Sequence, residues 1–253
     1  MTDAAVKGLS FEELAQVASA DGQPVVDLLG LLAGPWPGPV TAGWATEDPV
    51  TVLGVARAAR AYRETAPVVI EAGDAVARMA GVEPAATTTD LAAVARQGEP
   101  ALVAPGAEVT VARHTGTGVD LVDAVALLRR SHELVLLAGW DDTVAGIADV
   151  VVVPVCWTEA SVRDAATRID QWHRRGEQVH GRVVVAAHAA PAEPGLESRA
   201  RRWFTQLPVY PVPTDPATRS PGRSWTDLQP TTQTALANLA GGLIHTLQKG
   251  NLA

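Results

Sequence analysis

The chain has 253 residues, 47% of them hydrophobic, and carries a formal net charge of −8. This length and hydrophobic content suffice for the core of one large domain, whereas the negative charge disfavours a general affinity for nucleic acid or anionic membranes, because both require clustered cations. The single cysteine, Cys156, excludes an intrachain disulfide and a cysteine-rich metal site. Because the sequence has no signal-peptide pattern, no run of about 18 apolar residues and no histidine pair at metal-ligand spacing, we expect a cytoplasmic protein without a metal.

The elements can be predicted in chain order from the hydrophobic pattern. Residues 1–38 are expected to form an N-terminal helical arm with a Pro/Gly linker, and residues 39–253 an α/β domain. In this domain, short runs rich in Val and Leu alternate with amphipathic stretches, which is typical of βαβ units. Runs that are apolar on both faces indicate buried parallel strands. We therefore predict a doubly wound, mostly parallel sheet flanked by helices.

The individual segments follow from the same pattern. The expected strands are 67–70, 101–104, 134–139, 149–155 and 182–188. The expected helices are 50–64, 119–131, 158–175, 194–206 and 229–248. The stretch 211–225 contains several prolines and is expected to form a long loop with a binding or covering role.

One succession of segments is distinctive. LVLLAGWDD is followed by GIADVVVVPVCWTEASVRDAATRIDQW and then by GRVVVAAHAA. This order resembles the ParA/MinD family of deviant Walker ATPases, in which an aspartate-ending strand precedes a short helix, an A-D-x-V-V-V-V strand, a helix opening S-V-x-x-A and a V-V-V strand. The resemblance covers roughly residues 40–248. It implies a P-loop NTPase-like fold.

The phosphate-binding loop of that family departs from its pattern here. A Walker A loop needs several glycines, a lysine and a Ser/Thr for Mg²⁺. The matching residues 41–51 read TAGWATEDPVT, with one glycine, Gly43, beside the bulky Trp44. The lysine position falls on or near Asp48, with Glu47 adjacent, and the only two lysines of the chain lie close to its ends. Carboxylates at this position would repel phosphate.

The other nucleotide contacts implied by the resemblance are also altered. The family's second carboxylate position is held by Glu71, but the Walker B aspartate aligns with Ala138. The nearest acids, Asp141 and Asp142, follow about a turn too late for Mg²⁺. An alanine replaces the asparagine expected after the V-V-V strand. The resemblance therefore implies a degenerate, non-catalytic member, a pseudo-ATPase without a nucleotide cofactor.

Aromatic and basic residues suggest two further surfaces. Trp44, Trp140 and Trp157 each follow an expected strand, so their rings are expected either to fill the core or to form a protein-contact patch at the carboxyl edge of the sheet. A second set, Arg199, Arg201 and Arg202, is interpreted as a solvated helix face, with DNA contact as the alternative.

The function expected from these features is a protein-binding scaffold or regulator in positioning, partitioning or secretion machinery of an actinobacterium-like organism. The expected partner is a protein, such as an active ParA/MinD-type ATPase or a secretion or partition component, and a homodimer is a further option. Two alternatives stay open. One is an enzyme or ligand-binding switch of another doubly wound family, using Glu71, Asp74, Asp141 or Asp142. The other is a DNA-binding partition protein.

Overall fold

The computed structural model describes residues 27–63, 66–98, 108–140, 144–176, 181–189, 195–204 and 207–250. Eight parallel strands form one sheet in the order β3-β4-β2-β5-β1-β6-β7-β8. The strands are β1 (Val40–Trp44), β2 (Val68–Glu71), β3 (Ala86–Thr87), β4 (Thr110–Arg113), β5 (Leu134–Ala138), β6 (Val150–Cys156), β7 (Val183–His188) and β8 (Val209–Val212). The predicted doubly wound α/β fold is confirmed, and every strand pair in the described sheet is parallel.

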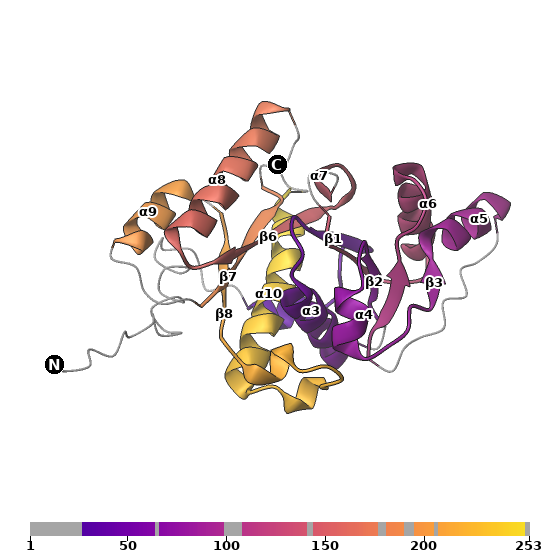
Figure 1. The fold of residues 1–253 in the computed structure, drawn as a ribbon, viewed down its shortest axis with the longest axis horizontal. Helices are drawn as coiled ribbons and strands as arrows, with labels where there is room; N and C mark the ends of the chain where they lie inside the picture. The colour runs from indigo at the N-terminus through magenta and orange to yellow at the C-terminus, as the bar shows by residue number, and fades with distance from the viewer. Residues whose placement is uncertain are drawn as a thin grey trace.

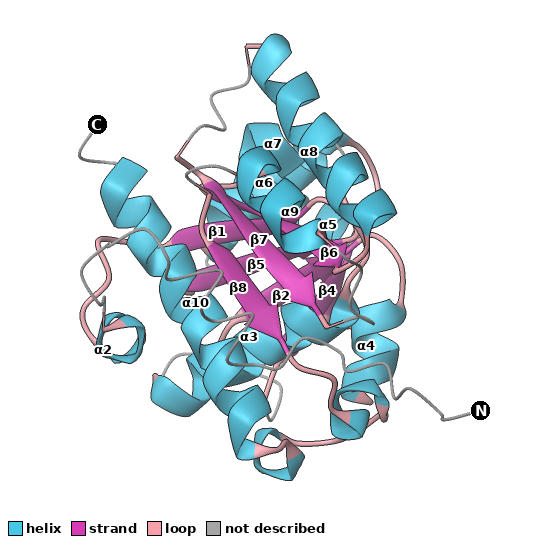
Figure 2. Ribbon diagram, turned by 90° about the vertical axis from the view of Figure 1, so that its left-hand side faces the viewer, coloured by secondary structure: helices cyan, strands magenta, loops and turns pink. Residues whose placement is uncertain are grey.

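Helices cover both faces of this sheet (Figures 1 and 2). One face is covered by α5 (Thr88–Gln97), α6 (Gly118–Leu128), α7 (Val144–Ile147), α8 (Glu159–Arg174) and α9 (Leu196–Trp203). The other face is covered by α2 (Leu28–Ala33), α3 (Pro49–Tyr62), α4 (Ala75–Ala80) and α10 (Pro230–Gly250). Successive strand residues alternate between the two cores: Val68 and Ile70 pack on the first face, Val69 on the second. This two-sided burial explains the continuous apolar runs.

Several short elements carry no clear sequence pattern. The strands β1, β3, β4 and β8 and the helices α4 and α5 were not among the predicted segments. β3 has two residues, and β4 reads TVAR, which is too polar and too short to stand out. The expected strand 101–104 lies outside the described residues. The short strands among them depend on pairing with neighbouring strands more than on local propensity.

The predicted loop 211–225 is partly wrong. Its first residues belong to β8, and it also contains short 3₁₀ helices at Pro216–Arg219 and Trp225–Asp227. Pro211 is tolerated in β8 because, among the described strands, β8 pairs with β7 alone and lies at the edge of the sheet.

The segment before β1 packs on the rest of the fold. On α10, a Cβ added at Gly241 would lie 2.1 Å from the backbone oxygen of Leu28, so α2 approaches α10 at a glycine. The Arg63 guanidinium lies 4.7 Å from the ring centroid of Trp36 and pairs with Glu133 at 2.7 Å. These contacts hold the segment that leads into β1.

Candidate functional site

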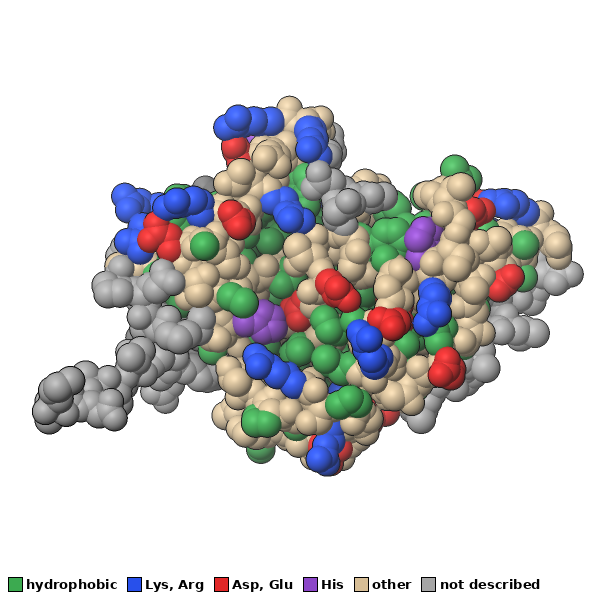
Figure 3. Space-filling model, in the orientation of Figure 1, with side chains coloured by type: hydrophobic (Ala, Val, Ile, Leu, Met, Phe, Trp, Pro, Cys, Tyr) green, Lys and Arg blue, Asp and Glu red, His purple; other side chains and the backbone are tan. Residues whose placement is uncertain are grey.

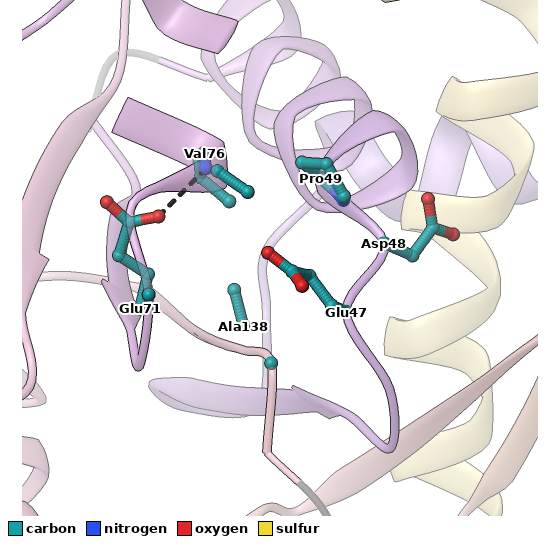
Figure 4. Close-up of a pocket in the computed structure, with 9 residues that line it drawn as sticks. Glu47, Asp48, Pro49, Glu71, Val76 and Ala138 are labelled. Atoms are coloured by element: carbon teal, nitrogen blue, oxygen red, sulfur yellow. Dashed lines mark hydrogen bonds between the residues drawn. The ribbon is translucent and has the colours of Figure 1, made fainter. Parts of the chain in front are cut away.

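A small pocket opens at the carboxyl ends of β1, β2 and β5, the edge of a parallel sheet where α/β proteins usually bind ligands (Figure 4). Its volume is about 80 Å³, well below the roughly 300–1,000 Å³ of typical ligand pockets. It is lined by Glu47, Asp48, Pro49, Glu71, Gly73, Ala75, Val76, Ala138 and Gly139. Of these lining residues, all in the described part of the chain, none is Lys or Arg. The pocket is therefore acidic.

Asp48 caps the first turn of α3. Its carboxylate accepts a hydrogen bond from the backbone N–H of Thr51 at 3.3 Å and another from the Thr51 hydroxyl. Its Oδ2 also lies 2.8 Å from Nε2 of His188, at the end of β7. A helix N-terminus carries a partial positive charge and free N–H donors, which favour an anion. Here the protein's own carboxylate takes that place.

The bonds around Asp48 form a connected buried network. Trp44, at the end of β1, donates its Nε1–H to the Thr51 hydroxyl oxygen at 2.7 Å. Burial by itself would raise the pKa of Asp48, but the hydrogen bonds from His188 and Thr51 hold this pKa below its usual value. Asp48 is thus an ionised, buried group that joins β1, α3 and β7.

Glu71 caps a second helix beside the pocket. It ends β2, is 2% exposed, and accepts hydrogen bonds from the backbone N–H groups of Val76 at 2.8 Å and Ala77 at 3.3 Å, at the start of α4. Burial raises the pKa of Glu71 above its usual value, against these backbone bonds and the charge of Arg113, which lower it. Both helix starts next to the pocket are therefore capped by internal carboxylates.

The opening of the pocket carries another acid. Glu47 is exposed, and Figure 4 shows its carboxylate directed towards Glu71, whereas the Asp48 carboxylate is directed away from Glu71. Pro49 is the first residue of α3 and lacks a backbone N–H. Residues 45–49 thus offer two acids and a proline where a phosphate would need donors and a cation.

The remaining nucleotide-site positions have other roles or are not described. A Cβ added at Gly43 would lie 2.3 Å from a methyl carbon of Val144, so this glycine allows α7 to pack on β1. Ala138 ends β5 at the wall of the pocket and bears no ligand atom. Asp141 and Asp142 lie outside the described residues. The contact of His188 with Asp48 was not predicted from the sequence. The Asp48-Pro49 pair, in contrast, is a recognisable helix start.

The three tryptophans expected at this edge lie in the core. Trp44, Trp157 and Trp140 are 0%, 1% and 9% exposed. Trp44 packs on the face of α3 and α10, and the other two pack on the opposite face. Trp140 also meets His114 edge-on, with ring centroids 4.5 Å apart. The three rings therefore do not form a common surface patch.

The arginines expected on a helix face lie on α9. Arg199 pairs with Glu159 at 2.9 Å, and Arg202 is exposed; the side chain of Arg201 is outside the described part. Among the described residues, no group of three or more His, Cys, Asp or Glu side chains could hold a metal ion. Within the same residues, no helix combines the length and apolar character that crossing a bilayer requires.

The all-parallel sheet, its two helical layers and the pocket at its carboxyl edge define a doubly wound α/β fold. No family model matches the chain, and no curated protein matches its sequence. Solved structures do match. More narrowly, they show that the chain has a ParA/MinD-like fold.

Three of these structures illustrate the match. The cell division protein MinD from Aquifex aeolicus superposes with a TM-score of 0.60 at 14% identity, over 82% of this chain and 97% of MinD. A ParA family ATPase from Chlorobium tepidum gives 0.55 at 10% identity, over 85% and 98%. The MinC:MinD complex from Aquifex aeolicus gives 0.53 at 12% identity, over 85% and 96%.

Proposed function

We propose that this protein does not bind nucleotide and acts as a non-catalytic, protein-binding scaffold or regulator in positioning, partitioning or secretion machinery. The observation that carries this proposal is the buried carboxylate of Asp48 on the N-terminus of α3. In a ParA/MinD-like fold, this helix start is where the resemblance places a triphosphate. An internal anion there competes with any bound phosphate.

The electrostatics of the pocket support the same conclusion. A phosphate group would face Glu47 and would have to approach Asp48 and Glu71, with no lysine or arginine among the described lining residues to offset its charge. Like charges at about 4 Å repel by about 1 kcal/mol in water and by about 4 kcal/mol near a protein surface. With two or three such contacts, triphosphate binding would be strongly disfavoured.

A role in protein contact is supported by the structural neighbours. One of them is MinD in a complex with MinC, and others are a ParA family ATPase and a partition protein. By analogy with that fold, we propose a protein partner for this chain, such as an active ParA/MinD-type ATPase or a secretion or partition component. This analogy concerns the class of partner, because fold alone does not define function.

The proposal is tested by calorimetric titration of the full chain with Mg·ATP and with Mg·ADP. We expect no heat of binding up to about 1 mM nucleotide. A dissociation constant of about 1 mM corresponds to a binding free energy of only about 4 kcal/mol. Adenosine is a useful second titrant because it lacks phosphate, so weak binding of adenosine alone would separate base recognition from phosphate repulsion. Micromolar affinity for Mg·ATP would refute the proposal.

A further inference from the structure

A surface formed by α8 and α9 carries an excess of arginine. We define it by Glu159, Arg163, Arg199, Arg202 and Trp203, and call it the α8–α9 arginine surface. In Figure 3, basic side chains gather over these two helices, at the upper left of the molecule. The five residues of this surface include three arginines and one glutamate, a net charge of +2, whereas the whole chain carries −8. The surface is therefore opposite in charge to the chain as a whole.

The contacts within this surface place two guanidinium groups around one carboxylate, and one of them also lies near an indole. Glu159 pairs through one carboxylate oxygen with Arg163 and through the other with Arg199, at 2.9 Å. The guanidinium carbon of Arg163 lies 6.0 Å from the ring centroid of Trp203. The side chain of Arg163 is 63% exposed, Arg202 is exposed, and Trp203 is partly buried against the core. The cluster is accessible and positive.

This combination of residues matches a protein contact. Arginine and tryptophan are enriched among the residues that dominate binding at protein interfaces. Guanidinium groups bind carboxylates through paired, charge-assisted hydrogen bonds. Binding to duplex DNA is instead favoured by a broad patch or stripe of clustered cations, whereas Glu159 stands at the centre of this cluster and Asp164 is exposed beside it on α8. Carboxylates interspersed in this way favour a protein ligand.

We infer that the α8–α9 arginine surface binds an acidic segment of a partner protein through carboxylates that contact Arg163 and Arg202. This inference rests on the proposed function, because it assigns the surface through which the protein contacts its partner. Glu159 is then an internal carboxylate that competes with the partner's carboxylates for Arg163.

The test uses the full chain and a fluorescein-labelled octaglutamate peptide, followed by fluorescence anisotropy at low salt. The double variant Arg163→Glu with Arg202→Glu is expected to weaken binding at least about tenfold, because it reverses both exposed charges. The matched control is Arg78→Glu with Arg96→Glu, which makes the same change in net charge at side chains that are 68% and 54% exposed on α4 and α5. The control is expected to stay within about threefold of the wild type, because only long-range repulsion changes.

A third variant is expected to change the affinity for the peptide in the opposite direction. Glu159→Gln removes the internal competitor and is expected to tighten peptide binding about two- to fivefold, an effect that misfolding could not produce. Equal weakening by the control variant, weaker binding by Glu159→Gln, or no binding of the peptide to the wild type would overturn the inference. Tighter binding of a labelled DNA duplex than of the peptide at the same salt would also overturn it. So would self-association of the wild type that is lost in the Arg163→Glu, Arg202→Glu variant, because the surface would then bind a second copy of the chain. Mg·ATP titration of the same samples tests the proposed function separately.

Discussion

At the scale of single residues, Asp48 has the largest structural role at the candidate site. It closes the first turn of α3, and through His188 it ties that helix to a strand 140 residues further along the chain. Such a residue contributes to stability and, under the proposed function, also keeps phosphate away. One side chain therefore accounts for both the order of the β1–α3 loop and the proposed loss of nucleotide binding.

Replacing Asp48 by Ala should lower the free energy of unfolding by about 2–3 kcal/mol, because it removes a helix cap and leaves buried partners without an acceptor. Urea denaturation followed by circular dichroism measures this change. The control is Asp27→Ala, which removes the exposed cap of α2, a single bond to Gly30, and should cost no more than about 1 kcal/mol. Equal losses in the two variants would show that the bonds to Thr51 and His188 contribute little.

Glu71 gives a prediction about pH, since burial raises its pKa. A carboxyl group whose pKa is raised by folding is most favourable below its unfolded pKa, and that contribution is lost as the pH rises through the folded pKa. Glu71→Gln cannot ionise and keeps an amide oxygen for the N–H of Val76. Its stability relative to the wild type should therefore improve between pH 4 and pH 7, as measured by urea denaturation at both values. A difference that does not change with pH, or that changes in the other direction, would contradict this role.

At the scale of elements, the contact of α10 with α2 and β8 depends on two adjacent glycines. A Cβ at Gly241 would lie 2.1 Å from the backbone oxygen of Leu28, and one at Gly242 would lie 2.2 Å from the ring of Tyr210. Burial raises the pKa of Tyr210 to about 12, consistent with its position under the helix. The long helix α10 therefore packs on α2 and on β8 at one place, through two adjacent glycines.

Gly241→Ala should destabilise the protein by about 1–3 kcal/mol, because the clash is with backbone and cannot be relieved by a rotamer change. This loss exceeds the gain of up to about 1 kcal/mol that alanine brings to a helix interior. Thermal and urea denaturation measure the effect. The matched control is Gly146→Ala in α7, where an added Cβ meets nothing within 4 Å and stability should be unchanged or higher. A stabilised Gly241→Ala protein would show that α2 does not pack on α10 in solution.

At the scale of the whole molecule, the fold resembles that of ParA/MinD proteins, whereas the pocket lacks the residues expected for nucleotide binding. The chain has the all-parallel sheet of a ParA/MinD-like protein, yet the described pocket at its carboxyl edge is small and acidic. Large folds keep their architecture through distributed burial, whereas a ligand site depends on a few side chains. The proposed loss of nucleotide binding therefore requires no change in the fold.

The oligomeric state should accordingly be independent of nucleotide. The elution volume of the full chain in size-exclusion chromatography with light scattering should be the same with and without Mg·ATP, because a ligand shifts an equilibrium only through differential binding. An ATP-dependent dimer would contradict the proposed function and would leave the α8–α9 arginine surface to be judged by its own test.

Hydrophobic periodicity was sufficient to predict the parallel α/β architecture, four of its strands and the main helices. The reason is that a strand buried on both faces has a continuous run of apolar residues. The absence of a lysine near the β1–α3 loop was also visible without a structure. Short elements such as β3 and β8 were not predictable in this way, because their order comes from neighbouring strands.

By itself, the sequence determined the fold class and the acidic character of the β1–α3 loop, since both depend on local composition. The partners of its side chains were decided only by the tertiary structure. Asp48 meets His188 across 140 residues, Glu71 turns onto the start of α4, and Trp44 and Trp157 enter opposite cores. Such contacts depend on strand order and on which face of the sheet a side chain enters, and neither is encoded in the local pattern of one segment.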